Sequence, residues 1–317
     1  THRVPAKKVP ILVIRDEVSK STMAYLAGRK GVVDWVVESV VQDLADWGYS
    51  SVRIAIKTDQ EDSIVAMRNA ITERRKAETV PKLSVKRDPK SHGEIEAAVK
   101  TWAGQFRTYK CNIEGETCRF LPIHCNAVSW LVRWSATALN LYRVQNNGVT
   151  AHEAIGGRHC ATPICPFGEH VQWKRHATGT NPKKAESEWY DGIFLGIRQV
   201  SGECIVGSAS GVVYCRTVRR VIDEDRWSMD AIKDISQSVR EVECSQHGGT
   251  YGDDLSAPVI IRWADIGKEK RDLEGDSAQV QHDEEYISRQ RGEVQNHDGL
   301  TVEAANLAEH DNDQDFD

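Results

Sequence analysis

Short apolar runs alternate with amphipathic stretches between residues 9 and 142, and this alternation constrains the fold more than any other feature. The runs at 9–15, 21–26 and 51–57 have the length of strands, and Thr79-Val80 is a shorter candidate. The longer stretches repeat apolar residues every three or four positions, as helices with one buried face do. We expect these helices at 32–47, 62–75, about 93–109 and about 126–142. Strands that alternate with helices predict an α/β layered fold.

The pattern changes near residue 145, where Gln145-Asn146-Asn147-Gly148 is a turn signal. Short apolar runs separated by Gly or Ser follow as far as about residue 221, and such spacing is typical of antiparallel strands. We therefore expect three parts. They are an α/β core at 1–145, a small antiparallel β domain at 146–230, and a linker with a disordered acidic tail at 231–317.

Charge is distributed unevenly along the chain. Its formal net charge is −6, but residues 265–317 hold 16 Asp and Glu against 5 Lys and Arg, a net of −11 that leaves +5 for residues 1–264. A mildly basic body suits a partner with a phosphate backbone, although +5 over that length is a weak signal.

Cysteine usage and hydropathy restrict the cellular compartment in which we expect this chain. Eight cysteines are too few for a disulfide scaffold in a chain of 317 residues, so we expect reduced thiols in the nucleus or cytoplasm. No apolar run reaches the roughly 18–20 residues that span a bilayer, so we expect no membrane partner. The first residues lack the apolar stretch of a signal peptide, and because the chain does not begin with Met we expect a fragment of a longer protein.

Two acidic residues stand where they could hold a metal ion. Asp59 follows the strand at 51–57, and Glu96 lies near the start of the helix at 93–109 with its side chain on the polar face. Carboxylates on rigid elements suit Mg²⁺, which prefers hard oxygen ligands. Basic residues near both would neutralise phosphates; they are Lys57, Lys82, Lys86, Arg87, Lys90, His92 and Lys100. In a chain with 47 acidic residues, however, spacing alone is weak support for catalysis.

Several motifs resemble those of copia-type retrotransposon integrases. Thr58-Asp59-Gln60-Glu61 is similar to their Thr-Asp-Asn-Gly motif, and Ser91-His92-Gly93-Glu94-Ile95-Glu96 to their Gln-Asn-Gly-x-x-Glu motif. The turn Ile14-Arg15-Asp16-Glu17-Val18-Ser19-Lys20 resembles their Ile-Asp-Asp-x-Ser-Arg. Further motifs follow in the order seen in copia-type Pol polyproteins. They are Thr150-Ala151-His152-Glu153, Pro166-Phe167-Gly168, Lys183-Lys184-Ala185, Gly192-Ile193-Phe194-Leu195-Gly196 and Cys215-Arg216-Thr217-Val218.

The resemblance covers roughly residues 9–227 and implies an RNase H-like mixed sheet with flanking helices. It also implies DNA end processing and strand transfer by an Asp, Asp, Glu triad that binds Mg²⁺ or Mn²⁺. Asp59 corresponds to the second acid and Glu96 to the third. The family's first Asp lies on a strand before the one at 9–15, so we expect a core without its first strand. Asp16 is the nearest substitute, and we expect it to be a turn residue.

Three functions therefore stay open. The first is an integrase-like enzyme that acts on element ends and target DNA as a homo-oligomer, as the resemblance implies. The second is a non-catalytic DNA-binding or interaction module, which an incomplete triad would favour. The third is an RNase H-like nuclease. Whether this chain is an enzyme is not decided by its sequence.

Overall fold

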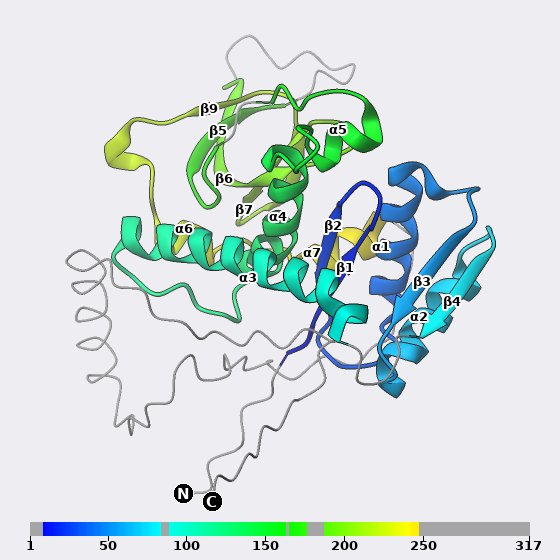
Figure 1. Cartoon of the computed structure of the whole chain (residues 1–317). Coiled ribbons are helices and arrows are strands. Elements are labelled where there is room, and N and C mark those ends of the chain that lie inside the picture. The colour runs from blue at the N-terminus through cyan, green and yellow to red at the C-terminus, as the bar shows by residue number, and fades with distance from the viewer. Residues whose placement is uncertain (1–8, 84–88, 163–164, 176–186, 247–317) are drawn as a thin grey trace, which may run out of the picture.

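The computed structural model of the chain describes residues 9–83, 89–162, 165–175 and 187–246 (Figure 1). One continuous apolar core extends through these residues, from Ile11 in the first strand to Val242 in the last helix. The mixed α/β class that we expected is confirmed. None of the helices described here is both long enough and apolar enough to cross a membrane.

The first two strands form an antiparallel hairpin at the centre of the core. β1 (Ile11–Arg15) pairs with β2 (Thr22–Leu26), with Val13 opposite Ala24. Most side chains on both faces of the hairpin are buried, which explains why both runs are mostly apolar and do not alternate with polar residues. Asn140 lies on the neighbouring helix α4 (Asn126–Tyr142). Its side-chain oxygen accepts a hydrogen bond from the backbone N–H of Thr22 at 2.8 Å, and its side-chain nitrogen donates one to the backbone carbonyl of Thr22 at 2.8 Å.

The next two strands form a separate parallel pair. β3 (Ile54–Thr58) pairs only with β4 (Thr79–Leu83) among the described strands, and α2 (Asp62–Arg74) connects them. We expected these four strands in one mixed sheet, but the described residues form two two-stranded sheets. In Figure 1, α1 lies between the β1–β2 hairpin and the β3–β4 pair. The RNase H-like arrangement is therefore not confirmed.

Helix α1 (Asp34–Leu44) buries Val36, Val37 and Val40 on one stripe, as its apolar spacing predicts. It continues into a π-helical turn, η1 (Ala45–Tyr49), in which Gly48 has φ +86°. A residue with a Cβ is strained at that φ, so Gly48 is where the helix can end.

Two long helices lie side by side against the strands. α3 (Pro89–Thr117) extends eight residues beyond the end that we expected, because Ile113 and Glu114 continue its buried face. α4 begins and ends where the sequence predicts. The indole Nε1–H of Trp102 on α3 donates to the carbonyl of Val132 on α4 at 3.2 Å, within a buried contact between the two helices.

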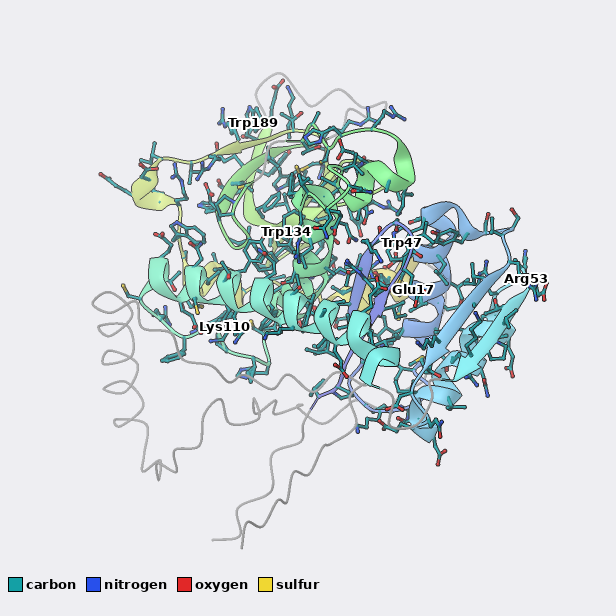
Figure 2. All side chains as sticks on the ribbon, in the orientation of Figure 1. Glu17, Trp47, Arg53, Lys110, Trp134 and Trp189 are labelled. Carbon is teal, nitrogen blue, oxygen red and sulfur yellow. The ribbon has the colours of Figure 1, made fainter. Side chains whose placement is uncertain are left out.

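The expected antiparallel β region is confirmed as a five-stranded sheet in the order β8-β7-β6-β5-β9. Its strands are β5 (His170–Lys174), β6 (Trp189–Ile197), β7 (Cys204–Ser208), β8 (Gly211–Cys215) and β9 (Val218–Arg220). The sheet packs on α4 through Phe194, whose ring is 5.8 Å from that of Trp134 at the centre of the molecule (Figure 2). Gly196 has φ +136°, and a Cβ there would lie 2.7 Å from Trp134. Only glycine allows this close approach of strand and helix.

A short helix and a buried ion cluster join this sheet to the core. α5 (Ala151–Gly156) begins with a capping box, in which Thr150 Oγ1 accepts from Glu153 N at 3.1 Å and Glu153 Oε2 from Thr150 N at 2.7 Å. Glu169 is fully buried, and its carboxylate accepts two hydrogen bonds from Arg220, at 2.6 and 3.0 Å. The Thr-x-x-Glu motif of the resemblance therefore has a structural role here, and the Pro-Phe-Gly motif directly precedes the buried Glu169.

The chain returns to the helices after the sheet. A 3₁₀ turn, η2 (Asp223–Asp225), leads to α6 (Met229–Lys233) and α7 (Val239–Gln246). Residues 231–246, where we expected the start of a linker, are therefore partly helical, and Ile232, Ile235, Val239 and Val242 are buried. The rest of the expected tail, 247–317, lies outside the described residues.

Candidate functional site

The carboxyl ends of β3 and β4 lie at one edge of their parallel pair, and Asp59 is the first residue after β3. Open α/β sheets usually present functional groups at this edge. The carboxylate of Asp59 is half-exposed, and its Oδ1 accepts a hydrogen bond from the backbone N–H of Gln60 at 2.6 Å. Asp59 is thus held locally by the backbone of the residue that follows it.

Two of the expected phosphate-binding residues lie side by side at this edge. Lys57 on β3 and Lys82 on β4 are register partners, so their side chains point to the same face of the pair. Both are exposed, whereas α2 covers the opposite face through Ile64 and Met67. Adjacent strands are about 5 Å apart, so the two lysine side chains leave the sheet close to each other.

Arg68 holds the two strand ends together from the covered side. It lies on α2 and is buried. Its Nη1 donates to Thr58 Oγ1 at 3.3 Å and to the carbonyl of Lys82 at 3.4 Å. A buried cation therefore links the Thr58 side chain on β3 to the backbone of Lys82 on β4.

Glu96 and Lys100 lie one turn apart on α3, and both are exposed, as we expected. Glu94, on the turn before, forms an ion pair with Lys20 in the β1–β2 turn, which places the amino-terminal part of α3 beside that turn. Neither a hydrogen bond nor an ion pair joins Asp59 to Glu96 in the described part of the chain. Their convergence on one ion stays a prediction.

The other expected phosphate ligands fall where side chains are not described. These are Lys86, Arg87, Lys90 and His92. Within the described ranges, no three side chains of His, Cys, Asp or Glu are placed to hold one metal ion. The chemistry of Asp59 and Glu96 nevertheless suits Mg²⁺, which is often held by one or two carboxylates together with substrate phosphates.

Asp16 occupies the β1–β2 turn. Its Oδ2 accepts hydrogen bonds from Ser19 N at 2.8 Å, Ser19 Oγ at 2.5 Å and Tyr49 OH at 2.9 Å. Burial raises the pKa of this carboxyl, but these hydrogen bonds outweigh burial and hold the pKa below its ordinary value. Its oxygens are engaged in shaping the turn, as we expected from its position in the motif.

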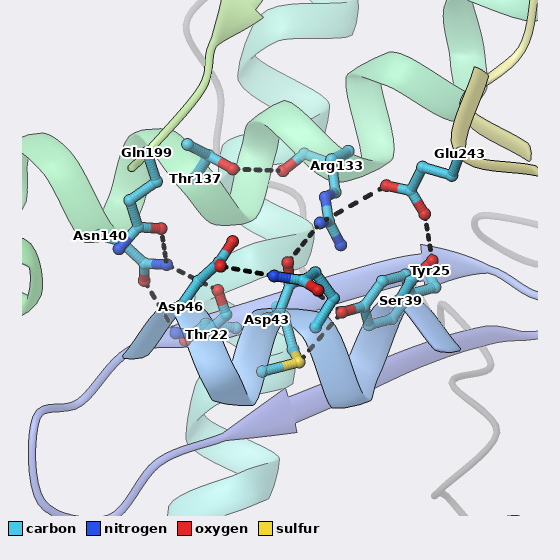
Figure 3. Close-up of polar contacts among 12 residues, drawn as sticks. Thr22, Tyr25, Ser39, Asp43, Asp46, Arg133, Thr137, Asn140, Gln199 and Glu243 are labelled. Carbon is cyan, nitrogen blue, oxygen red and sulfur yellow. Dashed lines mark hydrogen bonds and ion pairs between the residues drawn. The ribbon is translucent and has the colours of Figure 1, made fainter. Parts of the chain in front are cut away.

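Sequence analysis missed a polar network that links four elements around Arg133 (Figure 3). Arg133 Nη2 on α4 lies 2.8 Å from Asp43 Oδ1 on α1 and 3.6 Å from Glu243 Oε1 on α7. The hydroxyl of Tyr25 on β2 donates to Asp43 at 2.5 Å, and that of Ser39 donates to Glu243. These residues lie far apart in sequence, so only the fold brings them together.

The electrostatics of this network are those of a structural ion pair. Burial opposes the charged form of Arg133, but the Asp43 carboxylate raises its pKa well above the ordinary value. Burial and the charge of Asp43 raise the pKa of Asp46. These groups line a cleft of about 730 Å³ between α1, α4, α5 and the β6–β7 turn, and Arg158 and Arg198 line it as well. In this cleft, the described residues include no group of three His, Cys, Asp or Glu that could hold a metal ion.

Comparisons with known proteins give a distant structural likeness. No protein-family model matches the chain, and no curated protein matches it. Among solved structures it is similar to a chain in the cryo-electron-microscopy structure of the simian T-cell lymphotropic virus intasome in complex with PP2A regulatory subunit B56 gamma. The match has a TM-score of 0.36 at 14% identity and covers 69% of this chain and 82% of that one. At that TM-score the likeness carries no argument about fold or function.

Proposed function

We propose that this chain is an integrase-like domain that processes DNA ends and joins them to target DNA with the help of a divalent metal ion. The observation that supports this best is the edge formed by β3 and β4, where Asp59 lies two residues after Lys57 and Lys57 is the register partner of Lys82. A carboxylate for a metal and two cations for phosphates are the groups that phosphoryl transfer to DNA requires. The motifs around Asp59 and Glu96 support the same assignment.

In this proposal each side chain has a distinct role. Lys57 and Lys82 bind backbone phosphates and fix the position of the strand that is cut, and Lys100 extends that contact along α3. Asp59 and Glu96 would hold Mg²⁺ or Mn²⁺ through their oxygens. The ion, when bound, supplies charge stabilisation for the attacking and leaving oxygens of an in-line displacement. Arg68 is a positioning residue, because it fixes the two strand ends from the covered side.

A second candidate is a DNA-binding module without catalysis. It is favoured by the donor set, because within the described residues no three His, Cys, Asp or Glu side chains are placed to hold one metal ion. Two carboxylates suffice for one Mg²⁺ with a bound phosphate, but the two-ion arrangement implied by the resemblance needs more ligands. The basic edge would then bind DNA and leave it intact.

The test is a strand-transfer assay with a labelled duplex that mimics an element end, in Mg²⁺ and then in Mn²⁺. We expect metal-dependent nicking and joining by the unchanged chain, and at least a hundredfold loss of both in the Asp59→Asn, Glu96→Gln double variant. The control is the Asp62→Asn, Glu116→Gln double variant, which removes the same charge at two exposed positions. It should keep full activity.

Three results would change the assignment. Binding of the duplex without metal-dependent cutting by any variant would favour the DNA-binding module. Degradation of RNA–DNA hybrids without DNA joining would favour an RNase H-like nuclease. Activity that survives in the Asp59→Asn, Glu96→Gln variant would remove these residues from the site.

A further inference from the structure

The cleft of about 730 Å³ lies between the helices and the five-stranded sheet, and the proposed reaction does not use it. Its walls are α1, α4, α5 and the β6–β7 turn, and no described residue of β3, β4 or α3 lines it. Sites for small molecules have volumes of about 300–1,000 Å³ and combine apolar walls with a few placed polar groups. This cleft therefore has the volume for a ligand of the size of a nucleotide.

Hydrogen bonds to α4 hold two walls of the cleft in place. In the β6–β7 turn, Gln199 Oε1 accepts a hydrogen bond from Asn140 Nδ2 at 3.3 Å (Figure 3). In the segment after α5, the carbonyl of Thr162 accepts one from the hydroxyl of Tyr142 at 3.2 Å. A site with fixed walls binds its ligand at a lower cost in conformational entropy than a site that must first be ordered.

Asp46 lines the cleft with a carboxylate that no described side chain neutralises at ion-pair distance. Asp43, one turn earlier on α1, differs, because it has an ion pair with Arg133 and accepts a hydrogen bond from Tyr25. Asp46 accepts a hydrogen bond from Gln42 Nε2 at 2.8 Å. Partial burial and the charge of Asp43 raise the pKa of Asp46. A ligand that donates N–H groups to this carboxylate would favour its charged form.

Two guanidinium groups that line the same cleft also lack an ion pair. Arg158 follows Gly157, whose φ of +64° ends α5. Arg198 follows β6 and lies over the ring of Tyr214, 5.3 Å from its centroid. Both arginines are exposed, and neither pairs with a carboxylate of the described chain. Because guanidinium groups bind phosphate oxygens through parallel N–H bonds, these two suit a phosphate group.

The side chains around Asp46 indicate which base the ligand carries. Gln42 uses an amide N–H on Asp46, so the two side chains offer mainly acceptor oxygens to a ligand. Guanine has two neighbouring donors on its Watson–Crick edge, N1–H and the N2 amino group, whereas thymine has one. A carboxylate accepts from two neighbouring donors at once. Leu141, Ile155 and Ile197 supply apolar surface for the ring.

We propose that this cleft binds a guanine nucleotide. The Watson–Crick edge of the base donates to Asp46 and Gln42. The phosphate is bound by Arg158 and Arg198. The ligand is a free nucleotide or an unpaired guanine of a DNA strand, since both present the same edge and a phosphate. This goes beyond the proposed function and does not rest on it.

The contacts are tested by calorimetric titration of the full chain with dGMP, dTMP and deoxyguanosine. We expect dGMP to bind at least about tenfold more tightly than either, because dTMP lacks one donor and deoxyguanosine lacks the phosphate. Asp46→Asn should remove the preference for dGMP over dTMP. The Arg158→Gln, Arg198→Gln variant should weaken both nucleotides at least about tenfold and keep the preference. Equal affinities of the unchanged chain for all three ligands would overturn the proposal.

Matched controls separate the cleft from charge alone. Asp62→Asn removes an exposed carboxylate outside the cleft, and Arg53→Gln, Arg216→Gln removes two exposed guanidinium groups. Both controls should bind dGMP as the unchanged chain does. Equal losses in the controls and in the cleft variants would place the nucleotide elsewhere and overturn the proposal. All five substituted side chains and that of Asp46 are exposed, so thermal unfolding should be the same in every variant.

Competition against radiolabelled dGMP in equilibrium dialysis distinguishes the two sources. The competitor is a short thymine strand with one central guanine. Displacement of dGMP by this strand shows that the cleft accepts a nucleotide of DNA, and dGMP that stays bound shows a site for the free nucleotide. The same strand annealed to its complement should not displace dGMP, because cytosine occupies the donors of guanine. Equal displacement by the annealed strand, or no binding of dGMP and of the single strand, would overturn the proposal.

The proposal and the proposed function fail independently. If dGMP binds as expected and the chain joins no DNA, the proposed function is wrong and the nucleotide site stands. If the chain joins DNA and dGMP does not bind, the nucleotide site is wrong and the proposed function stands.

Discussion

Removing the charge of Glu169 should lower the stability of this fold more clearly than removing any other single charge. Glu169 is 0% exposed and precedes β5, where its carboxylate faces Arg220 on β9 and Arg226 beyond it. Cys165 Sγ also donates to it at 3.5 Å. Glu169→Gln keeps the size of the side chain but removes the charge that neutralises two guanidinium groups.

The expected loss in the free energy of unfolding depends on the burial of Glu169 and on how far the two arginines can turn to water in the variant. Breaking a buried ion pair by removing one partner costs about 3–5 kcal/mol. Arg220 is 49% exposed and Arg226 23%, so both can turn partly to water, and we take the lower end, about 3 kcal/mol. For a domain of this size that corresponds to a fall in Tm of about 6–12 °C.

The assay is urea unfolding followed by tryptophan fluorescence, together with thermal unfolding. The control is Glu188→Gln, which removes a carboxylate from an exposed pair with Lys174 on the same sheet and should leave the unfolding midpoint unchanged. A midpoint for Glu169→Gln that matches the control would refute the reasoning that the buried carboxylate holds β9 to the sheet. So would a Glu169→Gln, Arg220→Gln double variant whose loss equals the sum of the two single losses, because coupled partners are not additive.

Three further predictions concern other parts of the fold. Gly196→Ala should destabilise the chain by at least about 2 kcal/mol in urea unfolding, because the added Cβ meets Trp134 at 2.7 Å and φ is +136°; a loss below about 0.5 kcal/mol would contradict the close packing of β6 on α4. Thr150→Ala should cost about 1 kcal/mol through the lost cap of α5, and Thr150→Ser should restore it. The lowered pKa of Asp16 contributes stability that is present above its ordinary value of 3.8 and is lost as pH falls through the folded value. Asp16→Asn should therefore flatten the acid limb of the stability–pH curve, and an unchanged limb would contradict this.

Local elements were predictable because each has its own signal. The apolar spacing of α4 and its flanking polar residues gave both of its ends. The helices α6 and α7 were missed although a signal is present, since the buried residues Ile232, Ile235, Val239 and Val242 repeat every three or four positions from α6 into α7. The composition around them led us to expect a linker.

Pairing between strands was less predictable because it depends on distant parts of the chain. The split of the first four strands into two sheets is not encoded in any one run, and neither is the register that sets Lys57 beside Lys82. The sequence placed Asp59 after a strand and Glu96 on an exposed helix face, and both placements agree with the structure. The distance between Asp59 and Glu96 is set by the tertiary structure, and spacing along the chain does not determine it.

The most direct test of the proposed site is the affinity for Mn²⁺ measured by electron paramagnetic resonance in the presence of a short duplex. The unchanged chain is compared with Asp59→Asn, Glu96→Gln and the double variant. If both carboxylates hold one ion, each single variant should lower the affinity at least tenfold, and the double variant should lose little more than either single variant. Unchanged Mn²⁺ affinity in Glu96→Gln, with a loss in Asp59→Asn, would show that the two residues do not share an ion and would contradict the account.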